Sequence, residues 1–191
     1  IPSNWTWTSL AKIGHISPKT EGSDSQQASF VEMASIFAEY GKSHLTETRI
    51  WAEIKKGYTR FCEGDVGLAK ITPCFENGKS TVFESLHNGI GAGTTELLVL
   101  RPYLVETRYI ITFLKSEFFI GNGIPLMTGT AGQKRVPSGY FANCPFPLPP
   151  IEEQKRILAK VDELMALCDK LEARLDKEKA IKTDLLKTLT A

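Results

Sequence analysis

The chain has 191 residues, of which 42% are apolar and 24% are charged, and its net charge is +1. This composition is typical of globular domains, and no apolar run approaches the roughly 20 residues that a membrane helix needs. Residues 1–150 hold 14 basic and 13 acidic side chains, and residues 151–191 hold nine of each. Because neither part is basic overall, any contact with nucleic acid must come from a local patch.

The cysteines and the start of the chain bear on the cellular compartment. Cys62, Cys74, Cys144 and Cys168 are spaced by 12, 70 and 24 residues, without a Cys-X-X-Cys pair or a nearby histidine set for zinc. We therefore expect no metal site, and free thiols in a reducing cytoplasm. The first ten residues, IPSNWTWTSL, lack the basic start and apolar run of a signal peptide, and we expect the chain to be part of a longer cytoplasmic protein.

Residues 1–146 predict a mixed α and β domain. The segment 28–37 is rich in Phe, Val and Ile and indicates a strand or a short helix. Further strands are expected over 65–71, 80–86 and 95–102, and helices over 49–58 and 104–116. Because neither a regular alternation of strands and helices nor an internal repeat appears, we favour an α+β fold over a doubly wound sheet.

Three glycines, Gly89, Gly91 and Gly93, suggest a phosphate-binding loop. Such loops need a strand, then the glycines, then a helix whose N-terminus meets the phosphate, whereas these glycines precede a predicted strand and no Walker lysine is present. We interpret the segment as a flexible turn that enters a strand. The alternative is a turn that presents Thr94 and Thr95 to a polymer backbone.

Polar and cationic side chains gather in several segments that are candidate nucleic-acid contacts. In TGTAGQKRVPSGY (128–140), backbone amides beside Gly129 and Gly132, together with Arg135, are suited to phosphates, and Gln133 is suited to an adenine edge. The alternative for each segment is an exposed loop whose cations are only solvated. The candidate DNA-binding residues are Lys55, Lys56, Arg60, Lys70, Thr72, Asn77, Lys79, Thr94, Thr95, Gln133, Lys134 and Arg135.

The sequence gives little support for catalysis. His15, His44 and His87 are scattered, and the chain has no GxSxG motif, no HExxH motif and no paired-carboxylate spacing. The Asn/Asp-Pro-Pro-aromatic tetrapeptide of adenine methyltransferases is absent, because Leu148 precedes and Ile151 follows the Pro-Pro pair. We therefore expect no catalytic residue and no S-adenosylmethionine site in this chain.

The composition changes sharply at CPFPLPPIEE (144–153). The prolines of this segment fix an extended chain up to Pro150, and a helix that starts at Pro150 or Ile151 has Glu152 and Glu153 at the positive end of its dipole. The 41 residues from Ile151 onward contain neither Gly nor Pro, which is enough for a single helix of up to about 60 Å.

Apolar residues along this predicted helix follow the 4-3-4-3-4 spacing of a coiled-coil seam. The seam residues are Ile157, Val161, Leu164, Cys168, Leu171 and Leu175. A lone helix would leave this seam in water, and the sequence before Pro145 contains no second long stretch of the same period. The pattern therefore predicts a coiled coil with a partner helix.

The segment PLPPIEEQKRILAKVDELMALCDKLEARL (147–175) closely resembles the conserved region of the DNA-specificity subunits of type I restriction-modification systems. In that family a proline hinge, a Glu-Gln pair, here Glu153 and Gln154, and a long helix follow each target-recognition domain. The upstream segments IPSNWTWTSLAKI, GDVGLAKITPCFENGK, GTTELLVLRP and MTGTAGQKRVP are also similar to the family. The resemblance covers nearly the whole chain.

The resemblance implies a non-catalytic reader of double-stranded DNA. Members of the family carry two recognition domains, each reading half of a split site, and two helices that pair antiparallel. Methyltransferase (modification) subunits bind alongside and supply S-adenosylmethionine and the chemistry, and restriction subunits join the complex. This chain resembles half of a specificity subunit, the C-terminal half: a target-recognition domain (1–147) and a helix (148–191) for spacing, self-association and methyltransferase docking.

Two other classes of protein are alternatives to a DNA-specificity subunit. An enzyme is opposed by the missing motifs, and a coiled-coil scaffold that contacts no DNA remains the main alternative. A split DNA site needs two readers at a fixed separation, and a stiff helical pair sets that distance better than a flexible linker. We therefore favour a DNA reader whose helix is a spacer and assembly arm.

Overall fold

The computed structural model describes the backbone of residues 1–189 and the side chains of residues 1–183. The chain forms two compact units: the first is Ile1–Gln154, and the second begins at Lys155. A single helix, α6 (Ile151–Leu189), begins in the first unit and makes up the second. The predicted α+β class and the long C-terminal helix are confirmed.

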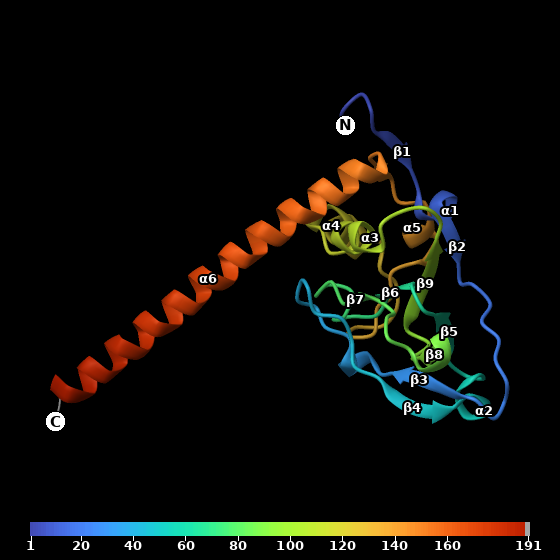
Figure 1. Ribbon diagram of the computed structural model, residues 1–191, viewed down its shortest axis with the longest axis horizontal. Coiled ribbons are helices and arrows are strands. Elements are labelled where there is room, and N and C mark those ends of the chain that lie inside the picture. The colour runs from blue at the N-terminus through green and yellow to red at the C-terminus, as the bar shows by residue number, and fades with distance from the viewer. Residues whose placement is uncertain (190–191) are drawn as a thin grey trace. The chain divides into compact units, whose positions relative to one another are not determined.

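The globular unit contains two four-stranded sheets and one two-stranded ribbon (Figure 1). The first sheet has the order β2 (Gly14–Ile16), β9 (Leu97–Pro102), β6 (Val66–Ala69) and β7 (Ser80–Val82), with all neighbours antiparallel. The second sheet has the order β4 (Glu47–Ile50), β3 (Gln27–Val31), β8 (Ile90–Gly93) and β5 (Thr59–Cys62), in which only β3 and β8 run parallel. The ribbon pairs β1 (Thr6–Thr8) with β10 (Phe146–Leu148).

Short helices accompany these sheets. Figure 1 shows α3, α4 and α5 gathered at the opposite end of the globular unit from β3 and β4. The α-helices are α1 (Leu10–Ile13), α2 (Trp51–Ile54), α3 (Thr107–Leu114), α4 (Glu117–Gly123) and α5 (Ser138–Asn143). Turns of 3-10 helix are Met33–Ser35, His87–Gly89 and Ile124–Leu126.

The expected strands and helices were found, but several were shorter than predicted. The helix predicted over 49–58 is a single turn, α2, because Arg49 and Ile50 belong to strand β4 and Gly57, with φ of 79°, lies beyond the helix. The segment 28–37 contains both alternatives, since β3 is followed by the 3-10 turn at Met33–Ser35.

The interpretation of Gly89, Gly91 and Gly93 as a flexible turn that enters a strand is correct for Gly89, which ends the 3-10 turn before β8, and wrong for the other two glycines. Gly91 and Gly93 lie inside β8, which is hydrogen-bonded to strands on both sides. A Cβ at Gly91 would lie 2.5 Å from the Phe61 ring and 2.8 Å from the Ser29 carbonyl oxygen. These glycines are therefore required by close packing in a central strand.

The core between the two sheets is built on an aromatic stack. Phe61 of β5 and Phe83, directly after β7, are fully buried, with ring centroids 3.5 Å apart and planes 4° apart. Val31 from the second sheet and Val99 from the first belong to the same buried cluster. A Cβ at Gly67 of β6 would lie 2.6 Å from the Phe83 ring, so this position also has no space for a larger residue.

The globular unit ends inside the first turn of α6. The Gln154 side chain is 2% exposed; its Oε1 accepts a hydrogen bond from Glu106 N at 3.0 Å, and its Nε2 donates to Pro149 O at 2.9 Å. The Glu153 carboxylate accepts hydrogen bonds from Trp5 Nε1 and Asn4 Nδ2. The Glu-Gln pair therefore ties the start of the helix to the N-terminal segment and to the turn before α3.

We predict that Gly67→Ala lowers the free energy of unfolding by about 1–3 kcal/mol, because the added methyl group displaces Phe83 from its stack. Gly121→Ala is the matched control: its Cβ meets nothing within 4 Å in helix α4, so it should raise stability by up to about 1 kcal/mol. Urea denaturation of both variants measures the effect. Equal stabilities of the two variants would contradict this account of the core.

Candidate nucleic-acid interface

The structure divides the candidate DNA-binding residues into two groups. The larger group, which we call the loop face, comes from three segments: 70–79 between β6 and β7, 94–95 between β8 and β9, and 133–135 before α5. Its residues are Lys70, Thr72, Asn77, Lys79, Thr94, Thr95, Gln133, Lys134 and Arg135. The second group, Lys55, Lys56 and Arg60, lies around α2 and β5.

The loop face is assembled by pairing between distant segments. Thr72 N donates to Lys134 O and Val136 N donates to Lys70 O, both at 2.9 Å, so residues 134–136 run along the chain that leaves β6. Arg135 and Thr128 exchange two backbone hydrogen bonds, which closes the segment between them into a hairpin. Directly after Thr128, Gly129 has φ of 131°, and a Cβ there would lie 2.7 Å from Gln133 O.

An arginine fork fixes this hairpin to the sheet. Arg135 Nε and Nη2 both donate to the Glu96 carboxylate, at 2.9 and 2.7 Å, and Nη1 donates to Gln133 O at 2.8 Å. The hydrogen bonds from Arg135 lower the pKa of the Glu96 carboxyl below its usual value, so the pair stays ionised at neutral pH. Glu96 precedes β9, and the pair therefore positions the hairpin relative to the core.

The predicted cations differ in what they offer to a ligand. Lys134 is exposed, together with Gln133, Thr95 and Asn77, whereas Lys70, Thr72 and Thr94 are half-buried. Lys79 is turned inward and its Nζ donates to Met33 O at 3.0 Å. Arg135 holds the hairpin as described above, so its first role is to position the loop that carries Gln133 and Lys134.

The second group surrounds a hollow of about 340 Å³ between the N-terminal segment and α2. Lys55 forms an ion pair with Asp24, and Arg60 Nη1 donates to Thr20 O at 3.3 Å. Lys56 is exposed at the rim. Lys55 and Arg60 thus bond to the N-terminal segment, whereas Thr72 of the loop face bonds to Lys134, so the sequence-predicted residues fall into two groups.

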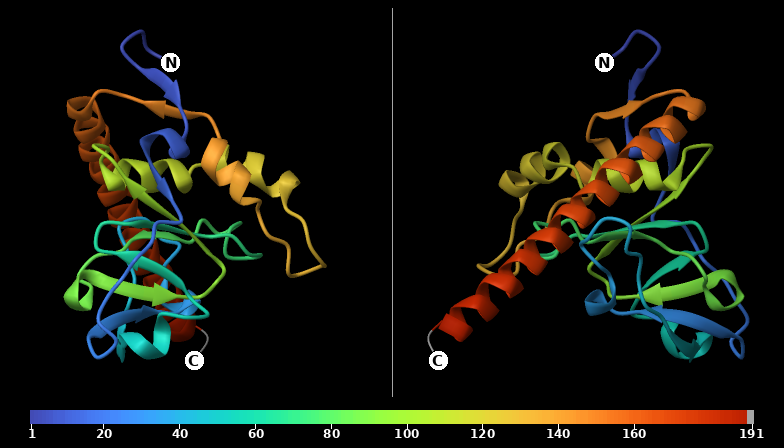
Figure 2. Two further views of the ribbon diagram at one scale, coloured as in Figure 1. Left: turned by 90° about the vertical axis from the view of Figure 1, so that its right-hand side faces the viewer. Right: turned by 60° about the vertical axis from the view of Figure 1, so that its left-hand side comes forward.

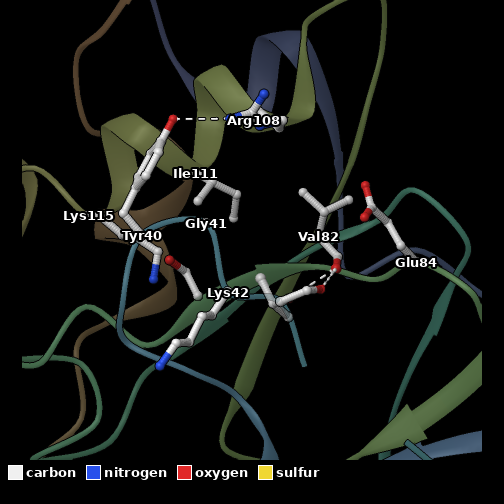
Figure 3. Close-up of a pocket in the computed structure, with 11 residues that line it drawn as sticks. Tyr40, Gly41, Lys42, Val82, Glu84, Arg108, Ile111 and Lys115 are labelled. Carbon is white, nitrogen blue, oxygen red and sulfur yellow. Dashed lines mark hydrogen bonds between the residues drawn. The ribbon is translucent and has the colours of Figure 1, made fainter. Parts of the chain in front are cut away.

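A second hollow lies between α3 and the segment before β4, where Tyr40, Lys42 and Arg108 surround about 110 Å³ (Figure 3). Lys115 Nζ donates to the carbonyl oxygens of Phe37, Ala38 and Gly78. Burial lowers the pKa of Lys115 to about 8, so the ammonium form still predominates at pH 7. Because Lys115 Nζ donates to these three backbone oxygens, the lysine holds the segment at Phe37 and Ala38 in place.

The histidines do not form a catalytic group. His15 and His87 are exposed, and His44 Nδ1 lies 2.9 Å from Ser43 Oγ and 3.2 Å from Thr81 Oγ1. Among the residues that the structure describes, His44 Nε2 is buried without a hydrogen-bond partner, and burial lowers the pKa of the imidazole. Its ring packs edge-on against Phe83, so this histidine belongs to the core.

Within the described side chains, no group of three or more His, Cys, Asp or Glu residues is placed to hold a metal ion. No helix in the described part of the chain is both long and apolar enough to cross a membrane. Along α6 the seam residues Ile157 and Val161 are half-buried and the other four are exposed. Leu164, Leu171 and Leu175 each expose about half of their surface.

The fold matches two solved structures. One is the crystal structure of the HsdS subunit from Thermoanaerobacter tengcongensis, with a TM-score of 0.74 and 26% identity. The other comes from work on complex assembly and conformational transition of the type I R-M system, with a TM-score of 0.74 and 25% identity. Each match covers 97% of this chain and 48% of the solved chain. The chain therefore shares its architecture with about half of each solved chain.

Residues 3–182 match the family model of the type I restriction modification DNA specificity domain, and the chain belongs to this family. The specificity subunits of the type I restriction enzymes EcoAI and EcoEI from Escherichia coli are both 46% identical to it over 197 residues. These matches cover the whole of this chain and 33% of each relative. The chain thus spans about a third of the length of these curated relatives, and the resemblance inferred from the sequence is confirmed.

Sequence reasoning missed the partner that organises the loop face. Glu96 was not a candidate, although a carboxylate beside two threonines at the start of an apolar strand is a detectable signal. Glu96 and Arg135 are 39 residues apart, so no local sequence pattern indicates that they pair. The anchoring role of Gln154 was also found only in the structure.

We predict that Glu96→Gln loosens the hairpin while leaving the core intact, because the amide cannot replace the charged fork. Hydrogen exchange at the Thr72, Thr128 and Arg135 amides should become about tenfold faster. Glu172→Gln, at an exposed position of α6, is the control and should change none of these rates. Unchanged protection in Glu96→Gln would show that the fork does not hold the hairpin.

Proposed function

We propose that this chain is a DNA-reading half of a type I specificity subunit and that the loop face contacts double-stranded DNA. The observation that carries the proposal is the fork-anchored hairpin, which presents Gln133 and Lys134 on a fixed backbone within a chain of the DNA specificity family. Rigid positioning suits base reading, because hydrogen bonds to base edges require fixed geometry. The basic hollow at Lys55, Lys56 and Arg60 is a second candidate contact with phosphates.

Within this proposal the chain has no catalytic residue and binds no S-adenosylmethionine itself. The relatives are named specificity subunits of restriction enzymes, which fits a role in choosing the site rather than in changing it. The chemistry and the cofactor belong to methyltransferase subunits, and restriction subunits join through the assembled complex in the cytoplasm. The domain (1–147) reads half of a bipartite target, and the helix (148–191) spaces and docks the subunits.

The exposed seam of α6 supports the proposal that this helix pairs with a second helix. Leu164, Leu171 and Leu175 leave about half of their surface in water in the single chain. The 4-3-4-3-4 spacing is symmetric about residue 166, so an antiparallel pair places Ile157 opposite Leu175 of the second copy. Such a pair holds two DNA readers at opposite ends of a rod. The alternative function, a scaffold that contacts no DNA, shares this pairing and differs only at the loop face.

We predict that Lys134→Ala weakens DNA binding across all sequences and lowers the salt slope by about one, because one phosphate contact is lost. Gln133→Ala should instead cost about 1–3 kcal/mol at a single base position. The measurement is binding to a randomised double-stranded DNA pool at several salt concentrations, with the chain alone and with methyltransferase subunits. Lys12→Ala, exposed on α1, is the control.

Two results would count against this assignment. Equal affinities and salt slopes for Lys134→Ala and the wild type would remove the loop face as the DNA contact. If the wild-type chain binds no DNA in either condition, the scaffold alternative is favoured.

We predict that Leu164→Glu and Leu171→Glu weaken self-association at least tenfold, because burying a leucine contributes about 1.5–3 kcal/mol and a buried charge opposes it. Ala173→Glu, on the opposite side of the helix, should leave association unchanged. Sedimentation at micromolar concentration gives the oligomeric state. A wild-type chain that stays monomeric would overturn the pairing.

The orientation of the pair is tested separately in a Cys168→Ser background. A chain with Ile157→Cys mixed with a chain with Leu175→Cys should form a disulfide-linked heterodimer if the helices are antiparallel. Disulfides between two copies of the Ile157→Cys chain would instead show a parallel pair.

A further inference from the structure

The loop between β6 and β7, residues 70–79, is folded into consecutive hydrogen-bonded turns. Asn77 N donates to Pro73 O at 3.0 Å, and Gly78 N donates to Phe75 O at 2.9 Å. Phe75 is fully buried, and Gly78 has φ of 67°, a backbone conformation that favours glycine. Figure 2 shows this loop and the hairpin of residues 128–135 on the same side of the globular unit.

Asn77 is the side chain of this loop that is suited to read a base. It is exposed, and among the residues that the structure describes none forms a hydrogen bond with its amide. An asparagine amide can donate to and accept from an adenine edge at the same time, in the major groove of DNA. Because hydrogen bonds weaken steeply away from their preferred distances and angles, the orientation of the turn beneath Asn77 determines how well it reads.

Lys115, directly after α3, holds this turn from one side. Its Nζ donates to Gly78 O at 3.0 Å, to Ala38 O at 2.8 Å and to Phe37 O at 3.4 Å. An ammonium group has three donors, so the whole group is used by the backbone of two segments. Since a half-buried charge without such partners is costly, the position of Nζ fixes residue 78 relative to residues 37 and 38.

Lys79 bonds to the same segment from within the turn. Its Nζ donates to Met33 O at 3.0 Å, and Met33 begins the 3-10 turn after β3. The four hydrogen bonds from Lys79 and Lys115, which we call the lysine clamp, thus connect residues 78 and 79 to residues 33–38. Hydrogen bonds from charged donors are about twice as strong as those between neutral groups.

The segment 33–38 is a firm support for the turn. Ile36 is fully buried in the same cluster as the stacked rings of Phe61 and Phe83, and Met33 packs against this cluster. The lysine clamp therefore connects the turn that carries Asn77 to the part of the core where the two sheets meet.

We propose that Lys115 and Lys79 are positioning residues for DNA recognition, and that Asn77 is the base-reading residue that they position. The inference rests on the proposed function of the loop face. It gives the two lysines a role other than contact with phosphates. Asn77 and Gln133 are then held by separate contacts, since the lysine clamp holds the turn at Asn77 and the fork between Arg135 and Glu96 holds the hairpin at Gln133.

A direct phosphate contact is the alternative role for the two lysines. Both side chains are half-buried, and both ammonium groups already donate to carbonyl oxygens. Binding a phosphate would break these bonds and release the turn. A phosphate contact also contributes equally to all DNA sequences, whereas a positioned reader contributes at one base pair.

A double-mutant cycle tests the inference on a randomised double-stranded DNA pool, with the chain bound to methyltransferase subunits. Asn77→Ala should lower the preference for one base at one position about tenfold to a hundredfold. Lys115→Met should lower the same preference about tenfold and leave the position read by Gln133 unchanged. The double variant should lose no more than Asn77→Ala alone, because both changes act on one contact.

The salt dependence of binding separates positioning from phosphate contact. Lys115→Met and the control Lys12→Met, exposed on α1, should both keep the salt slope of the wild type. Lys79→Met removes a single bond of the clamp, so it should lower the Asn77 preference about threefold with little effect on folding. If Lys79 instead contacted a phosphate, the slope would fall by about one and the base preference would stay the same.

Hydrogen exchange tests the clamp without DNA. In Lys115→Met the amides of Asn77 and Gly78 should exchange about tenfold faster, because the turn loses its support. The amides of Thr128 and Arg135, which belong to the hairpin, should exchange at the wild-type rate. Unchanged exchange at Asn77 and Gly78 would show that Lys115 does not hold the turn.

The outcomes separate this inference from the function on which it rests. Base preferences that are unchanged in both lysine variants, or an affinity that falls equally for all sequences, would overturn the positioning role. A normal base preference in Asn77→Ala would remove the reader. If Gln133→Ala still loses a base preference in these cases, the loop face reads DNA and this inference alone fails. A wild-type complex that binds no DNA would overturn both.

Discussion

The stacked rings of Phe61 and Phe83 hold the two sheets of the globular unit together, and the rest of the unit depends on this contact. The rings lie 3.5 Å apart, so the strands around them have space for little more than hydrogen atoms at Gly67 and Gly91. Two glycines in central strands are unfavourable for strand formation in isolation. Here they allow a large aromatic contact that offsets this cost.

The position of the loop face follows from this core. Strand β6 ends at Ala69, β8 ends at Gly93 and β9 begins at Leu97. The residues after β6 and those between β8 and β9 therefore leave the core at the same place, because Ala69 and Leu97 are paired. The hairpin from Thr128 to Arg135 then joins them through backbone bonds at Lys70 and Thr72 and through the fork to Glu96. The candidate reading residues are thus supported by the core through a short series of directional bonds.

Polar contacts hold the start of α6 in place, whereas apolar contacts hold the core together. Gln154 is buried with both ends of its amide bonded, and Glu153 accepts two hydrogen bonds from the N-terminal segment. Buried polar groups of this kind tolerate few alternative geometries, because each unmade bond is costly. In a protein proposed to measure the distance between two half-sites, such an anchor matches the need for a defined helix start.

The sequence by itself determined the features that depend on local pattern. The long helix, its heptad seam and the proline hinge follow from residue spacing and from the absence of Gly and Pro after Pro150, and the family follows from motifs along nearly the whole chain. Strands β6 and β9 were expected because their apolar runs are continuous. Short strands such as β1, β4 and β5 were not, since three or four residues carry too little pattern.

Only the tertiary structure decided which polar residues form a surface. Gly91 and Gly93 suggested a turn, yet they lie in a central strand because neighbouring strands and the Phe61 ring occupy the space of a side chain. Lys79 and Arg135 looked equally available for phosphates in the sequence, but one donates to Met33 O and the other to Glu96. Long-range contacts of this kind depend on how strands pack rather than on any local period, so no reading of spacing reveals them.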